Sequence, residues 1–162
     1  MNSPSLAPPE KSPPLLVPVG EDRYGEFKVL GISSIAVKVS RRETRDLLAV
    51  EIMLRQKGGP EKHLHYDQDE WFYALEGDLV VEIGDERFRM KPGDSLFVRR
   101  TVPHTWANAG ATRMRFLALV TPAGQLEEFF ENAAKMKALP GPDPAHWRPY
   151  GLEWVGPPLQ LD

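Results

Sequence analysis

Short runs of alternating apolar and polar residues follow one another along the middle of the chain. Near residue 115, for example, Arg113 and Arg115 alternate with Met114 and Phe116. Such alternation is typical of a strand with one face in the core and the other in water. Segments rich in Gly, Pro and Asp separate the runs, which predicts the hairpins of an all-β sandwich or barrel. The expected strands are 34–39, 47–55, 70–75, 79–83, 87–90, 95–98, 104–108 and 113–120.

The pattern changes period after residue 121, where apolar residues recur every three or four positions. Leu126, Phe129 and Phe130 fall on one face, which predicts an amphipathic helix that covers one end or face of the barrel. We expect Thr121 to cap this helix, Pro122 to be its first residue and the Pro-Gly-Pro sequence after residue 139 to end it. The two phenylalanines are interpreted as core residues.

Prolines separate the middle of the chain from its ends. Six of the sixteen lie in 1–20 and six in 140–158. We predict a proline-rich N-terminal arm at 1–18, a β-barrel with its helix at 19–139, and an aromatic, proline-rich segment at 140–162 that packs on the barrel or on a partner subunit. The arm is either a disordered leader or a strap across a partner subunit, and a homodimer is expected.

Charge and cysteine content exclude several classes of function. The chain has 20 basic and 23 acidic side chains, a balance without the basic field that nucleic acid requires. Since it has no cysteine, it can form neither a disulfide nor a thiolate metal site. Neither a signal-like start nor a long apolar stretch occurs, so we expect a cytoplasmic protein that binds no membrane.

Three of the four histidines fall in two clusters. His63 and His65 stand two residues apart, so in a strand both point to the same side. Glu70 opens an apolar run, where an acid would be costly to bury unless it met a cation or a hydrogen bond. His104 comes from a later strand. Such nitrogen and oxygen ligands suit one divalent transition metal ion (Fe, Mn, Ni, Co, Cu or Zn), and the sequence does not choose among them.

Two stretches resemble the two sequence motifs of the cupin superfamily. They read GGPEKHLHYDQDEWFYALEGDLVVEIG and GDSLFVRRTVPHTWAN. The resemblance implies an antiparallel double-stranded β-helix, the jelly-roll or cupin barrel, with a metal inside it. Carried over by position, the implied metal ligands are His63, His65, Glu70 and His104.

The chain departs from these motifs at three positions. Lys57 stands where the first motif has its glycine, and Arg99 and Thr101 replace the usual Pro and Gly of the second. Because the four implied ligands are intact, the departures affect the loops and the entrance of the site rather than metal binding.

A narrower resemblance covers more of the chain. The segments VGEDR, TPAGQLEEFFENAA and YGLEWVGPPL are similar to single-domain cupins related to quercetinase, the flavonol 2,4-dioxygenase. This resemblance implies a dioxygenase that acts on a flavonol or another enol-containing small molecule with O2, and Glu70 would be its general base. The alternatives are a metal-dependent isomerase, lyase or hydrolase for a sugar or keto acid, and a cupin that binds metal or ligand without catalysis.

Strand parity adds further candidates around the metal. Phe72 shares the side of Glu70, and Trp106 shares the side of His104, so each either lines a substrate pocket or belongs to the core. Arg99 and Arg100 either meet an anionic substrate at the mouth or are solvated surface charges.

Overall fold

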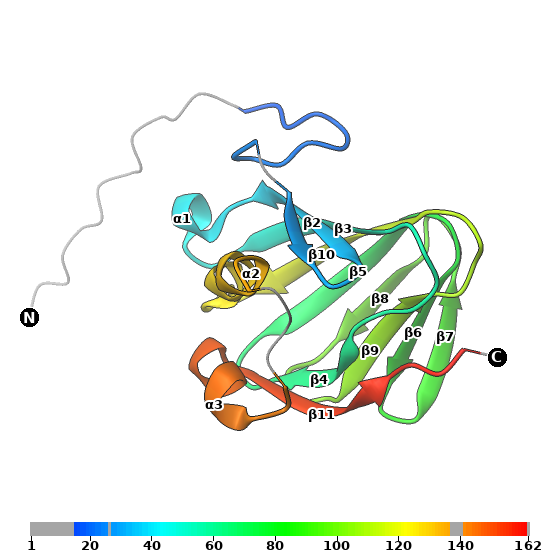
Figure 1. Ribbon diagram of the computed structural model, residues 1–162. Coiled ribbons are helices and arrows are strands. Elements are labelled where there is room, and N and C mark those ends of the chain that lie inside the picture. The colour runs from blue at the N-terminus through cyan, green and yellow to red at the C-terminus, as the bar shows by residue number, and fades with distance from the viewer. Residues whose placement is uncertain (1–14, 26, 137–140, 162) are drawn as a thin grey trace, which may run out of the picture.

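The computed structural model describes residues 15–25, 27–136 and 141–161. Two antiparallel sheets face each other, and the helices gather at one end of the strands (Figure 1). This arrangement confirms the predicted all-β jelly-roll fold. In sheet order, one sheet contains β1 (Lys28–Leu30), β2 (Ser33–Val39), β3 (Leu48–Leu54), β10 (Met114–Thr121), β5 (Asp69–Glu76) and β8 (Ser95–Val98). The other contains β11 (Leu152–Pro158), β4 (Glu61–His65), β9 (His104–Asn108), β6 (Leu79–Ile83) and β7 (Glu86–Met90).

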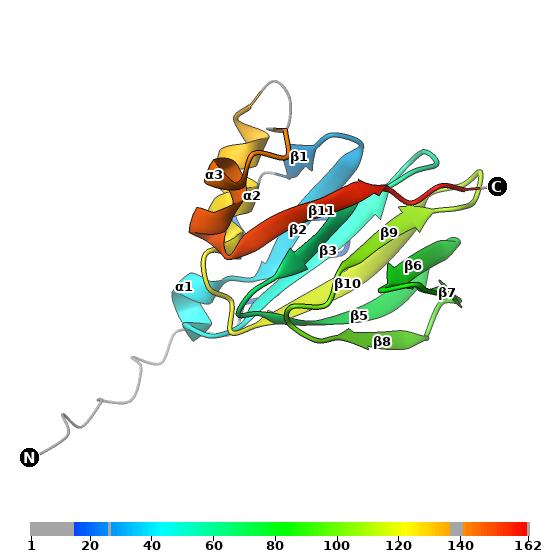
Figure 2. The same ribbon diagram turned by 90° about the horizontal axis from the view of Figure 1, so that it is seen from below.

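The helical segments are short. They are α1 (Arg41–Thr44), α2 (Leu126–Ala134), α3 (Pro144–Trp147) and the 3-10 helix η1 (Arg148–Tyr150). Figure 2 shows α2 and α3 together beyond one end of the sheets. Helices from the C-terminal third of the chain therefore cover one end of the barrel.

Alternation along the strands places the core between the two sheets. In β10 the buried residues are Met114, Phe116, Ala118 and Val120, and the residues between them are partly exposed. This strand lies between β3 and β5, so both of its edges are hydrogen-bonded, and its buried face belongs to the core. Burial of this apolar face is the main favourable term for the sheet.

The predicted start of the helix is wrong. Thr121 is the last residue of β10 and pairs with Asp69, and α2 begins at Leu126 with Gln125 at its N-cap. The backbone of Thr121 is paired within the sheet, and the N–H of Ala123 donates a hydrogen bond to the carbonyl of Asp46 at 2.8 Å. The first helical turn can therefore form only after these contacts end. The predicted end is also wrong: α2 ends at Ala134 with Lys135 at its C-cap, before the Pro-Gly-Pro sequence, part of which lies outside the described residues.

A buried carboxylate holds α2 against the barrel. Glu127 is fully buried, accepts from the Ser40 hydroxyl at 2.8 Å, and accepts from the backbone N–H of Arg41 at 3.0 Å. Charged hydrogen bonds of this kind are the strong ones, and a buried acid without them would be costly. The side of α2 that carries Phe129 is thereby fixed over the barrel end.

The C-terminal segment joins the second sheet. Strand β11 pairs with β4, with Leu152 opposite His65 and Trp154 opposite His63. Of the two packing partners expected for this segment, the structure therefore shows the barrel of the same chain. It also places two apolar side chains beside the predicted metal ligands.

The N-terminal arm lies mostly outside the described residues, which begin at Leu15. Leu15 and Leu16 are exposed. The homodimer and the role of the arm stay predictions. Within the described residues, none of the helices has the length and apolar character needed to cross a membrane.

Gly77→Ala should destabilise the fold. Gly77 has a φ of +82°, and a Cβ there would lie 2.5 Å from the carbonyl oxygen of Arg113. The left-handed backbone alone costs a non-glycine residue about 1–2 kcal/mol, and the clash adds to it. The matched control is Gly84→Ala, where φ is +58° and nothing lies within 4 Å. In urea denaturation, Gly77→Ala should lose clearly more stability, and equal losses would contradict the clash.

Candidate metal centre

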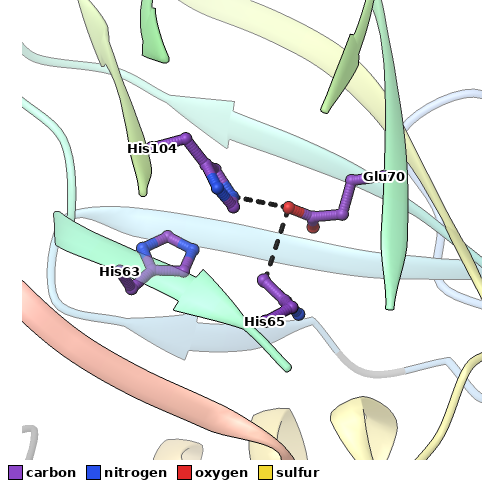
Figure 3. Close-up of side chains that lie close together, drawn as sticks. All are labelled: His63, His65, Glu70 and His104. Carbon is purple, nitrogen blue, oxygen red and sulfur yellow. Dashed lines mark ion pairs between the residues drawn. The ribbon is translucent and has the colours of Figure 1, made fainter. Parts of the chain in front are cut away.

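Four side chains from three strands meet between the two sheets (Figure 3). His63 and His65 come from β4 and His104 from β9, where His63 and His104 are paired neighbours. Glu70 comes from β5 in the opposite sheet. One ligand atom from each residue lies within 4.8 Å of the others. The structure thus brings together all four residues that the motif resemblance implied.

Hydrogen bonds at the outer nitrogens fix how the three imidazoles face. Nδ1 of His63 lies 2.8 Å from the carbonyl of Glu61, and Nδ1 of His104 lies 2.9 Å from that of Val102. Because a carbonyl oxygen can only accept, each Nδ1 carries the proton and donates it. The Nε2 atom of each ring then keeps its lone pair, which is the form that binds a metal.

Gln68 fixes the ring of His65 through Nδ1, as the backbone carbonyls do for the other two histidines. This residue was not identified from the sequence. Its Oε1 lies 2.6 Å from Nδ1 of His65, and its Nε2 donates to the carbonyl of Ala123. The second bond fixes which end of the amide faces the imidazole, so Nδ1 of His65 is the donor. Gln68 is 3% exposed. It connects a predicted metal ligand to the loop that precedes α2.

The inner atoms of the cluster fit a cation. Nε2 of His104 lies 2.6 Å from Oε2 of Glu70, and Nε2 of His65 lies 3.4 Å from it. The contact between Oε2 of Glu70 and Nε2 of His104 lacks hydrogen-bond geometry, and neither of these buried atoms has another hydrogen-bond partner among the described residues. Buried polar atoms are rarely left without one. Three imidazoles and a carboxylate aimed at one point satisfy these atoms if they hold a divalent transition metal ion.

Burial and mutual charge shift the pKa values of the cluster. Burial, with help from His104 and His65, lowers the pKa of His63 to about 3. Burial alone would raise the pKa of Glu70, but the imidazoles of His65, His104 and His63 outweigh it and lower that pKa to about 2. Burial would also lower the pKa of His104, and the adjacent Glu70 carboxylate raises it instead. Glu70 is therefore ionised at neutral pH, and His104 retains a proton to higher pH than the other two.

A cavity of about 330 Å³ adjoins the cluster. Both pocket candidates line it: Phe72 is 1% exposed and Trp106 is 7% exposed. Each packs edge-on against Phe116, so they belong to the core and to the cavity wall at once. The phenylalanines of α2, expected only as core, also line the cavity. Its apolar lining is completed by Leu30, Ile32, Ile35, Ile52, Pro60, Leu126, Phe129, Phe130, Trp147, Leu152, Trp154 and Pro158.

The substituted motif positions Lys57, Arg99 and Thr101 are not among the residues that line this cavity, and neither is Arg100. Arg100 forms an ion pair with Asp69 at 2.7 Å, and Arg99 is exposed, so neither contributes to the lining. Thr101 adopts a φ of +65°, the left-handed conformation usually given to glycine, and its N–H donates to the carbonyl of His65 at 2.6 Å. The turn therefore keeps its shape and supports a metal ligand although it lacks the glycine.

Gln68→Ala should weaken metal binding without unfolding the barrel. Loss of the bond to Nδ1 frees the His65 ring to rotate and to change tautomer. Removal of an outer partner of this type typically costs about 10- to 100-fold in metal affinity. Metal titration under chelator competition measures the change. Gln125→Ala is the matched control because this exposed glutamine makes no side-chain cap bond, and an equal loss in both variants would contradict the role of Gln68.

Acid should release the metal by protonating His104. A metal and a proton compete for Nε2, and Glu70 raises the pKa of this imidazole in the metal-free protein. His63 should not compete in mild acid, since its pKa lies near 3. Below the pKa of His104, metal affinity should therefore fall about tenfold per pH unit. Dissociation constants measured from about pH 8 to about pH 5 test the slope, and a constant affinity would contradict it.

Comparison with known proteins identifies the domain. The family model described as "Cupin domain" matches residues 50–120. The tetracenomycin polyketide synthase protein TcmJ of Streptomyces glaucescens is 30% identical over 84 residues, which are 52% of this chain and 54% of that protein. An oxidoreductase of Arthrobotrys oligospora is 32% identical over 81 residues, 45% of this chain and 32% of that protein. The chain thus spans about half or less of these relatives' lengths.

The solved structures agree on the fold. The structure of KdgF from Halomonas sp. superposes with a TM-score of 0.55 and 21% identity, covering 60% of this chain and 86% of that one. At this identity the likeness concerns the fold alone. The family match falls on the strands that carry Glu70 and the histidines, and the two-sheet topology surrounds them. The chain therefore contains a cupin domain at residues 50–120.

Proposed function

We propose that the protein is a metal-dependent dioxygenase that opens a ring of a flavonol or of another enol-containing aromatic molecule. One observation carries the proposal: the His/His/Glu/His cluster lies at the side of a cavity whose other walls are mostly aromatic and aliphatic. Such a cavity, with polar groups gathered at one place, is the usual form of a site for a small apolar ligand. Similarity to an oxidoreductase supports the redox class.

The residues of the cluster have separable roles in this proposal. A bound divalent ion would act as a Lewis acid that polarises the enol oxygens of the substrate and orients them toward O2. His63, His65 and His104 present fixed Nε2 atoms, so they hold the site without rearrangement. Glu70 is ionised at neutral pH and takes the proton of the enol hydroxyl as general base.

The lining argues against a sugar or a keto acid as substrate. Among the described residues that line the cavity there is no Lys or Arg to pair with a carboxylate, and outside the cluster the side chains with polar groups not bonded to the backbone are Ser33, Glu61 and Trp106. A sugar would lose most of its hydrogen bonds to water in such a cavity. A volume of about 330 Å³ suits one small molecule of a few rings.

A second candidate is a ring-forming rather than a ring-opening reaction. The match to TcmJ, a polyketide synthase protein, favours an enolisable polyketide chain as substrate. The same cavity and the same base would serve, because proton abstraction beside a carbonyl also produces an enolate. This reaction consumes no oxygen.

Oxygen dependence separates the two candidates. Protein purified without air is loaded with each candidate metal and mixed with 3-hydroxyflavone, and oxygen uptake and loss of the flavonol absorbance are recorded together. The dioxygenase consumes one O2 per flavonol and is inactive without air. If no loaded form takes up oxygen with 3-hydroxyflavone or with any other enol tested in the same way, the dioxygenase proposal fails. Anaerobic turnover of a polyketide model compound would favour the cyclase instead.

A further inference from the structure

Aromatic rings from the C-terminal third of the chain form one side of the cavity. Phe129 and Phe130 come from α2, Trp147 from α3 and Trp154 from β11, and we call these four residues the aromatic wall. The ring of Phe129 lies 5.1 Å from that of Trp147, which lies 5.5 Å from that of Trp154. Since Trp154 is paired with His63, the wall runs from the helix to the edge of the metal cluster.

The aromatic wall has no free polar group. Nε1 of Trp147 donates to the carbonyl of Gly141 at 2.8 Å, and Nε1 of Trp154 donates to the carbonyl of Gly156 at 2.7 Å. The two phenylalanines have none to offer. The wall therefore presents ring surfaces that can stack on a flat ligand and cannot hydrogen-bond to it.

The other polar side chains of the lining, Ser33, Glu61 and Trp106, belong to strands other than those of the wall, and Trp106 lies on β9 with His104. Ser33 belongs to β2 and Glu61 to β4, the strand of His63 and His65. A ligand that places its oxygens on the metal cluster must then lay its remaining rings against apolar surface. A hydroxyl on those rings would leave water without gaining a partner, which is unfavourable.

We propose that the aromatic wall makes the site selective for enols whose remote ring carries no hydroxyl groups. The inference rests on the proposed function for the enol end of the substrate, and it adds a rule for the opposite end. An apolar pocket rejects a ligand with an added hydroxyl by roughly 10- to 100-fold. Phe129 and Phe130 are the specificity-determining residues of the wall that can be tested by substitution with tyrosine, which keeps the aromatic ring and its packing.

Binding without turnover tests the selectivity. The metal-loaded protein is titrated in the absence of air with 3-hydroxyflavone, whose phenyl ring is unsubstituted, and with the derivative that has a catechol in place of that phenyl. Quenching of tryptophan fluorescence gives both dissociation constants. The catechol derivative should bind at least about 10-fold more weakly. Equal affinities, or a preference for the catechol, would overturn the inference and leave the proposed dioxygenase untouched.

The remaining outcomes separate this inference from the proposed function. If neither compound binds, the inference and the flavonol proposal both fail. If the selectivity is present but air brings no oxygen uptake, the dioxygenase proposal fails and the selective wall stands.

Conservative variants locate the selectivity. Phe129→Tyr and Phe130→Tyr each keep the ring and add a hydroxyl that a catechol can meet, so at least one should reduce the affinity ratio several-fold. Phe97→Tyr is the matched control because Phe97 lies on β8 and is 54% exposed. Circular dichroism checks that each variant is folded. An unchanged ratio in both wall variants would refute the role of the wall.

Discussion

Glu70→Gln is expected to lower oxygen-dependent turnover by about 100- to 10,000-fold, the usual contribution of a general base. Glutamine has nearly the same shape and keeps an oxygen that can face a cation, but its amide cannot accept the enol proton. The carboxylate is the only acid in a cluster that otherwise contains imidazoles. The variant should therefore retain part of its metal and lose the chemistry, which steady-state oxygen uptake and elemental analysis measure on one sample.

Glu76→Gln provides the control for this substitution. Glu76 lies on the same strand, is partly exposed and pairs with Arg113 at 2.8 Å, away from the cavity. It should turn over at the wild-type rate. An unchanged rate in Glu70→Gln with full metal occupancy would remove Glu70 from the role of base.

The metal cluster illustrates what can be read from the sequence. Its residues follow simple parity: His63 and His65 share a strand face, and Glu70 and Phe72 share another. Strand β10 was equally easy to predict from the sequence, since its apolar residues alternate with polar or less buried ones without interruption. In both cases a local period of two records which side chains face the interior.

Other elements lack such a local signal. Strand β4 was not among the predicted strands because its sequence EKHLH puts histidines where apolar residues would mark the inner face. Strand β11 contains Gly156 and two prolines, which are disfavoured inside a sheet. These residues are tolerated because β11 is an edge strand, which pairs only with β4. The position of a strand in the sheet cannot be read from a local sequence pattern.

Gln68 and the cavity depend on contacts between distant parts of the chain. The role of Gln68 follows from a bond to the carbonyl of Ala123, 55 positions away. The cavity combines Leu30 from β1 with Trp154 from β11, near opposite ends of the described residues. The sequence predicted the type of chemistry at the cluster. The shape and polarity that decide among substrates required the folded chain.

His104→Ala is expected to abolish stable metal binding while the barrel stays folded. This imidazole supplies the one ligand from β9, and its Nε2 is the atom nearest to Glu70 in the cluster. Loss of a ligand should exceed the roughly 100-fold loss caused by removing an outer partner. The wild-type protein should gain about 2.7 kcal/mol of stability when free metal is about 100 times its dissociation constant, and the variant should gain none.

Thermal unfolding with and without metal, together with metal content after dialysis against a chelator, measures this difference. His146→Ala is the matched control because His146 is exposed on α3 and does not belong to the cluster. It should keep both the metal and the metal-dependent gain in stability. If His104→Ala retained full occupancy, His63, His65 and Glu70 alone would hold the ion, and the unpartnered Nε2 of His104 would need another explanation. Loss of metal in both variants would instead indicate unfolding or a second site, which the metal-free unfolding curves distinguish.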